Sequence, residues 1–158
     1  MALENTITDY KNKIITKIIE NENLLKALTN TDSDFISQTL SISAPEDVVY
    51  SYVFPYMDSK TILTETQSFI TMEFRDFKSS KGNYYKSGQV LFYIICEKSL
   101  IKTSMGNRYD YIFERLMEIF DESKDIGIGK MIISKWGDMS FGDDYLGCYC
   151  ILELTDFK

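Results

Sequence analysis

Residues 89–97 read QVLFYIICE, and the run Val90–Cys96 within them is apolar at every position. Successive side chains of a strand point to opposite faces of a sheet, so a run that is apolar throughout indicates cover on both faces. A buried helix is the alternative, but the aromatic and β-branched residues of the run favour a strand. We therefore expect a central strand here.

Three more strands are predicted around this one. Phe69–Phe77 alternates apolar with mostly polar residues, and the polar turn Lys78–Asn83 joins it to the central strand. Gly129–Trp136 and Tyr145–Thr155 flank a loop at 137–144 that is rich in turn-forming residues. Strands joined by short loops form antiparallel hairpins, so the sequence predicts two hairpins.

Helical spacing of apolar residues predicts two amphipathic helices. The first spans roughly residues 8–28, and the second starts after the capping residue Asn107. The apolar positions of the second helix are Tyr109, Ile112, Phe113, Leu116, Met117 and Phe120.

The segment between the first helix and the first strand has no clear period. Residues 29–45 are predicted to be a loop, whose apolar residues either anchor it to the core or dock onto a neighbour. Tyr50, Val53 and Phe54 fit a single helical turn, and Pro55 forces Phe54 into an extended conformation.

These elements predict the α+β class. We expect one domain over residues 1–158, with 29–45 as an inserted loop. Its antiparallel or mixed sheet has about four strands, and two main helices pack on one face.

Charge and hydropathy narrow the function classes. The net charge is −7 and the pI is near 4.6, which disfavours a DNA-gripping protein but allows an acidic wall that DNA passes without sticking. The same acidity is also a common means of keeping a protein soluble. No apolar run reaches 18 residues and no signal peptide is recognisable, so we expect assembly in a cytoplasm.

The sequence contains no histidine, which removes the commonest general base and most catalytic zinc sites. Cys148 and Cys150 share one face of a strand, where two core thiols are favoured over a metal pair. We expect no catalytic activity, no cofactor and no metal. The carboxylates that remain for acid–base chemistry are better explained as solvated or ion-paired groups: Glu73, Glu97, Asp110 and Glu153.

The start of the second predicted helix, Gly106–Asp110, contains an unusual charge. Asp110 suits the positive end of the helix dipole, whereas Arg108 does not. An arginine placed against this preference is either simply solvated or reaches for a carboxylate or a neighbouring subunit.

The order of these elements resembles the tail terminator and tail-completion proteins of long-tailed phages and related contractile particles. The matching pieces cover most of the chain, and residues 29–45 are an insertion in it. They are the N-terminal helix, Phe54-Pro55-Tyr56 before the strand 69–77, the strand 90–96 ending in Glu97-Lys98-Ser99-Leu100, Gly106-x-Arg108-x-Asp110 entering a helix, and a closing hairpin.

The resemblance implies a subunit that closes into a ring, typically a hexamer. Such a ring caps the tail tube, stops tube growth, joins the neck and lets DNA pass through its lumen. Ring closure needs edges or loops that meet a neighbour. The strand 145–155 lacks Lys and Pro and is either internal or an edge covered by the next subunit. The interface residues expected are Lys78, Lys81, Tyr84, Arg108, Asp110, Asp138, Phe141 and Asp143.

Other readings stay open. A neck or head-completion connector has a similar organisation, and a monomeric adaptor or chaperone-like module needs no ring. A small enzyme that uses Glu73, Asp110 or Glu153 is the least favoured.

Overall fold

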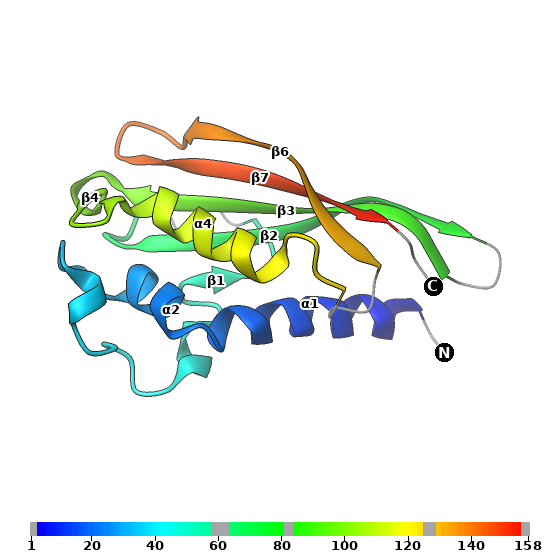
Figure 1. The fold of residues 1–158 in the computed structure, drawn as a ribbon, viewed down its shortest axis with the longest axis horizontal. Coiled ribbons are helices and arrows are strands. Elements are labelled where there is room, and N and C mark those ends of the chain that lie inside the picture. The colour runs from blue at the N-terminus through cyan, green and yellow to red at the C-terminus, as the bar shows by residue number, and fades with distance from the viewer. Residues whose placement is uncertain (1–2, 58–63, 81–83, 125–128, 156–158) are drawn as a thin grey trace.

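The computed structural model describes residues 3–57, 64–80, 84–124 and 129–155. One mixed sheet runs the length of the molecule, and helices cover one of its faces (Figure 1). The predicted α+β class is therefore confirmed. The sheet has five strands in the order β1-β2-β3-β7-β6, because a strand of only two residues, β1 (Val53–Phe54), pairs in parallel with β2.

Both predicted hairpins are present. β2 (Ser68–Ser80) pairs with β3 (Tyr84–Glu97), and β6 (Lys130–Ser140) pairs with β7 (Tyr145–Thr155). β3 and β7 are antiparallel neighbours and join the two hairpins into one sheet.

The central position of β3 is also confirmed. Phe92 and Ile94 are buried in the main core under the helices. Ile95 is buried on the opposite face in a smaller cluster with Phe54, Phe69 and Tyr145. Both faces of the strand are covered, as its continuous apolar run predicted.

Three helices pack on the main face of the sheet: α1 (Leu3–Ile19), α2 (Glu22–Thr29) and α4 (Arg108–Phe120). The single helix predicted over residues 8–28 is wrong, because the chain breaks after Ile19. Asn21 caps the second part, and its side-chain oxygen accepts a hydrogen bond from the Leu24 amide at 2.9 Å. Among the described helices, none combines the length and apolar character needed to cross a membrane.

The segment after α2 is mostly irregular, as predicted, and contains two short 3-10 helices at Phe35–Ser37 and Pro45–Val48. Phe35 is fully buried and anchors it to the core. The helical turn predicted around Tyr50 and Val53 is wrong, because Val53 begins β1. The extended conformation predicted for Phe54 is confirmed.

Two strands extend beyond their predicted ends. β2 continues to Ser80 and β6 to Ser140, so Lys78 and Asp138 are strand residues rather than loop residues. The middle of the first predicted turn, 81–83, lies outside the described residues. β7 is internal, and the edge strand of this hairpin is β6.

Smaller elements connect β3 to α4. A 3-10 turn at Lys98–Leu100 leads into a two-stranded ribbon of β4 (Lys102–Thr103) and β5 (Gly106–Asn107). This ribbon lies at the same end of the molecule as the β6–β7 loop.

Candidate interaction surfaces

The three thiols lie in the interior and are all unpaired. Burial raises the pKa of Cys150 to about 12 and that of Cys148 further still, and it also raises the pKa of Cys96. Thiols in this state are protonated and unreactive at neutral pH. The prediction of core thiols at Cys148 and Cys150 is confirmed. No group of metal-ligating side chains occurs within the part of the chain that the structure describes.

The four candidate carboxylates each interact with a neighbouring group. Glu73 forms an ion pair with Arg75, and Glu153 accepts a hydrogen bond from the Gln89 side chain at 3.0 Å. Glu97 accepts from the Ser99 amide at 2.9 Å, and Asp110 accepts from the Asn107 side chain at 3.2 Å. These contacts account for the carboxylates without assigning them a role in catalysis.

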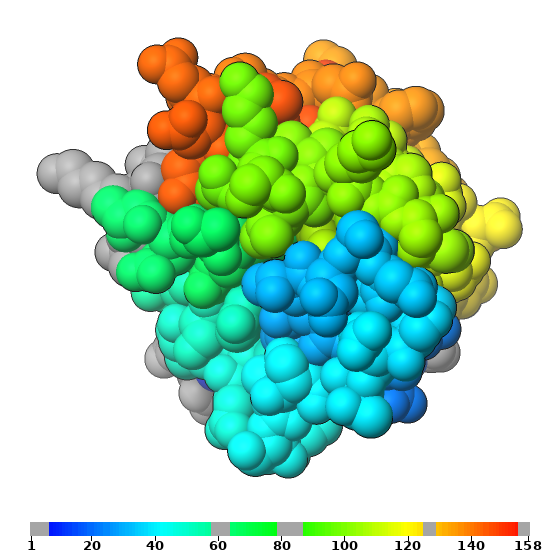
Figure 2. All heavy atoms as spheres, turned by 90° about the vertical axis from the view of Figure 1, so that its left-hand side faces the viewer, coloured from blue at the N-terminus to red at the C-terminus, as the bar shows by residue number. Residues whose placement is uncertain are grey.

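The structure separates the residues expected at an interface into two groups at opposite ends of the sheet (Figure 1). Lys78 is exposed near the tip of the β2–β3 hairpin, where Tyr84 begins β3 and Lys81 lies outside the described residues. Asp138, Phe141 and Asp143 lie at the other end. There, the 31–48 segment, the chain after Glu97 and the β6–β7 loop form one continuous surface (Figure 2).

Phe141 is only half-buried and lies edge-on to Tyr93, with 6.2 Å between the ring centroids. It packs against the small cluster on the outer face of the sheet. Asp143 is exposed in the loop beside it.

Arg108 occupies a place different from the one expected. Its side chain is 1% exposed, and its Nε donates to the Leu100 carbonyl at 2.7 Å. Its two terminal nitrogens donate to carbonyls in the last turn of α2 and in the chain that follows it, and its Cζ atom lies 4.9 Å from the centroid of the Phe35 ring. These carbonyls belong to Ala27, Asn30, Thr31 and Asp32. The guanidinium therefore joins distant parts of one subunit and is not presented to another.

Asp110 and Asp138 each lie near enough to Tyr109 for their charges to affect its hydroxyl. Burial first, then the negative charges of Asp138 and Asp110, raise the pKa of the Tyr109 hydroxyl. The two carboxylates come from α4 and β6 and give this edge of the molecule a negative charge. Their proximity could not be derived from the sequence, where they are far apart.

The edge strand β6 carries three exposed large apolar residues: Ile132, Trp136 and Met139. Trp136 is 61% exposed, and its ring lies 5.3 Å from that of Phe113 on α4. We call Trp136 together with Phe113 the β6 ridge. Sequence periodicity does not reveal this ridge. The available signal was the single tryptophan of the chain, set among Ser134, Lys135, Gly137 and Asp138.

A second group of exposed apolar residues lies at the opposite edge of the sheet, where α1 passes the segment 49–57. Here a hollow of about 560 Å³ separates the helix from the turn before β1. We call it the α1 groove. It is lined by Ile7, Thr8, Lys11, Asn12, Ile15 and Thr16 on one side and by Val49, Tyr50, Pro55 and Tyr56 on the other.

The far wall of the α1 groove has an unusual backbone. Tyr50 has φ +65°, the left-handed region that bulky side chains rarely adopt. Its amide donates to the Val53 carbonyl at 2.9 Å, which closes the turn, and its side chain is 63% exposed. The Tyr50 ring lies 6.2 Å from that of Tyr56. Backbone strain of this kind is often found at functional surfaces.

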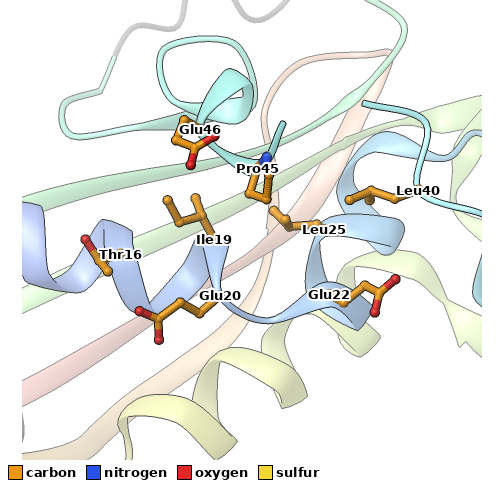
Figure 3. A pocket seen from close by; sticks show the side chains of 8 residues that line it. All are labelled: Thr16, Ile19, Glu20, Glu22, Leu25, Leu40, Pro45 and Glu46. Carbon is orange, nitrogen blue, oxygen red and sulfur yellow. The ribbon is translucent and has the colours of Figure 1, made fainter. Parts of the chain in front are cut away.

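A second hollow of about 500 Å³ adjoins the first at Thr16 (Figure 3). Ile19 and Leu25 face Pro45 across it. Its rim carries the carboxylates of Glu20, Glu22 and Glu46. The two hollows differ in charge, because Lys11 is the only charged side chain among the described residues that line the α1 groove.

Comparison with known proteins identifies a family. A family model described as YomW matches residues 21–154, which extend from the cap of α2 almost to the end of β7. No curated protein and no solved structure matches the chain.

Proposed function

The chain belongs to the YomW family, a phage-associated (SPBc2 prophage-like) domain, and from this premise we propose that it is a structural protein of a phage particle. In this proposal it is a tail terminator: copies form a ring, proposed to be a hexamer, at the head–tail junction. The ring caps the tail tube, ends its growth and joins it to the neck. The protein has no catalytic activity or cofactor in this role, and its place is the virion.

The observation that carries the proposal is the distribution of exposed apolar side chains. Single exposed apolar residues are ordinary on any surface, but groups of them mark contact sites. Among the described residues, the exposed large apolar side chains other than Met105 lie on β6 or at the α1 groove and the adjoining Met57, on opposite edges of one sheet. A subunit with contact surfaces on two opposite edges is suited to head-to-tail association, which closes into a ring when the rotation per subunit divides a full turn.

The net charge of −7 also supports the proposal. DNA must move through the centre of such a ring, and an excess of carboxylates repels phosphates rather than holding them. The contact partners would then be sister copies, the tube protein and the neck protein, with DNA only passing through.

Electron microscopy of particles assembled without this protein tests the proposal. We expect overlong tails, since nothing would stop tube growth, and normal length should return when the wild-type chain is supplied. Tails of normal length that lack heads would instead support a neck or head-completion connector. Intact, infectious particles would contradict both roles and would leave a monomeric adaptor as the remaining hypothesis.

A further inference from the structure

We propose that the α1 groove of one copy receives the β6 ridge of the next copy, with Trp136 as the residue that enters it. This inference rests on the proposed ring and names the contact that closes it. It commits to a second copy of this chain as the occupant of the groove.

The placement of the two surfaces favours this pairing. The ridge lies on the edge strand β6, and the groove lies beyond β1 at the other edge of the sheet. Figure 1 shows β1 and β6 at opposite edges of the sheet, with β2, β3 and β7 between them. Because the surfaces differ and lie on opposite edges, the contact is head-to-tail, and a pair of copies keeps one free ridge and one free groove at its two ends. Such a contact repeats from copy to copy until a ring closes.

The groove suits an aromatic side chain in size and chemistry. Its volume of about 560 Å³ lies within the range of pockets that enclose small organic ligands, so an indole ring has room to enter. Ile7, Ile15, Val49 and Pro55 supply an apolar lining, while Tyr50 and Tyr56 supply aromatic faces. A tryptophan that fills an aromatic pocket is a common anchor of protein interfaces.

The charges of the two surfaces are opposite. Lys11 is the charged residue of the groove, where its ammonium group lies over the Phe74 ring at 5.2 Å and donates to the Pro55 carbonyl at 3.4 Å. Asp138 lies two residues after Trp136 in β6, and residues two apart point to the same face of a strand. Asp110 adds a second carboxylate nearby. Docking of the ridge would bring these negative charges toward Lys11.

The strained turn at Tyr50 has a role in this arrangement. The left-handed backbone at this residue directs a large ring outward beside Tyr56, where it adds a wall to the groove. Burial of that ring against a second copy would compensate for the strain of the turn.

The test uses two variants that each destroy one surface. Trp136→Ser removes the ridge and keeps the groove. Tyr50→Gly combined with Tyr56→Ser removes the aromatic wall and keeps the ridge, and glycine suits the left-handed backbone at position 50. Met105→Ser is the matched control, because Met105 is exposed in the β4–β5 turn and is part of neither the α1 groove nor the β6 ridge. Circular dichroism checks folding, and Trp136→Gln replaces the ridge variant if the serine variant unfolds.

Sedimentation velocity of the full-length chain gives the readout. We expect the wild type and Met105→Ser to form rings, and each surface variant to associate at least about 30-fold more weakly, as the loss of an interface anchor implies. An equimolar mixture of the two surface variants should form dimers, because the intact groove of one accepts the intact ridge of the other.

Three outcomes would overturn the inference: a surface variant that still forms rings as the wild type does, a mixture that stays monomeric, or a wild type that is monomeric at its highest soluble concentration. These outcomes are separate from the fate of the proposed function. Unaffected rings in the variants, together with overlong tails in particles lacking the protein, would reject this contact and keep the terminator role. Dimers in the mixture together with tails of normal length would support this contact and reject the terminator role.

Discussion

The two strands of the last hairpin differ both in apolar content and in their surroundings: eight of the eleven residues of β7 are apolar, against five of the eleven in β6. β7 lies between β3 and β6, and its residues Cys148, Cys150 and Leu152 are buried in the core. β6 pairs with β7 at the edge of the same sheet and leaves Trp136 and Met139 exposed. The apolar side chains of β7 stabilise the subunit, whereas those of β6 remain available to a partner. The interior strand is the more apolar of the two, and the apolar side chains of β6 stay accessible because β6 lies at the edge of the sheet.

Substituting one glycine in each strand tests this difference between β7 and β6 with the largest expected effect. Gly147 of β7 lies where an added Cβ would be 1.7 Å from the carbonyl oxygen of Ile94 in β3. That overlap involves backbone and cannot be relieved by a side-chain rotation. We expect Gly147→Ala to lower the free energy of unfolding by more than about 4 kcal/mol, measured by urea denaturation.

Gly137 of β6 is the matched control. Its added Cβ would lie 3.3 Å from the Tyr149 ring, which can move aside. We expect Gly137→Ala to cost less than about 1 kcal/mol. Equal losses of unfolding free energy in the two variants would show that β6 and β7 are packed equally closely, which would contradict the difference between them.

A second contrast concerns two charged residues that the sequence placed in one group. Arg108 is buried and donates to five carbonyl groups of its own chain, whereas Asp138 is exposed on β6. Arg108→Met would leave buried carbonyls without donors, so we expect a loss of about 3 kcal/mol in unfolding free energy. Asp138→Asn should change it by less than about 0.5 kcal/mol. A stable Arg108→Met variant would mean that water or a rearranged loop replaces the guanidinium.

The sequence predicts local elements of this fold well, and long-range contacts poorly. Periodicity locates β3, α4 and β7, because each is long enough to show its pattern. β1 has only two residues, too few for any period. The burial of Arg108 depends on carbonyls that lie about 80 positions earlier in the chain, and local charge preferences contain no information about them.

The candidate surfaces were harder to foresee for the same reason. The α1 groove exists because the segment 49–56 returns beside α1, and the β6 ridge exists because β7 takes the interior position. Of the residues predicted at an interface, Asp110 and Asp138 both lie near Tyr109, although they are far apart in the sequence. The sequence places Trp136, the aromatic residue of β6, in a strand but does not indicate that its ring is exposed.

Exchanging cysteine and serine between β7 and β6 should change the free energy of unfolding by an intermediate amount. Cys150 of β7 is fully buried and behaves as a small apolar side chain, while Ser134 of β6 is exposed and donates to the Ile151 carbonyl at 3.2 Å. Cys150→Ser should cost about 1–2 kcal/mol, because a hydroxyl enters the core. Ser134→Cys should change the unfolding free energy by less than about 0.5 kcal/mol. Thermal denaturation of both variants measures the loss of stability. A similar loss in both would mean that β6 is as buried as β7, contrary to this prediction.

Trp136 itself separates stability from association. Its ring contacts Phe113 but remains mostly exposed, so folding of the monomer buries little of its apolar surface, and removing the ring takes away little of that burial. We expect Trp136→Ser to lower the unfolding free energy of the monomer by less than about 1 kcal/mol, measured under dilute conditions where copies do not associate. A loss above about 2 kcal/mol would place Trp136 in the core of the subunit rather than on a contact surface.

The smallest expected effect tests the charges around the ridge. Asp138→Lys and Lys11→Asp each place like charges across the proposed contact, and an exposed ion pair contributes roughly 0.2–1 kcal/mol, so each variant should weaken association by up to about fivefold. The double variant restores opposite charges with their positions exchanged and should recover most of the loss. Salt should reduce all of these differences, because both groups face solvent. If the double variant associates as weakly as the sum of the single variants predicts, Asp138 and Lys11 do not meet, and the ridge must enter the groove in another orientation.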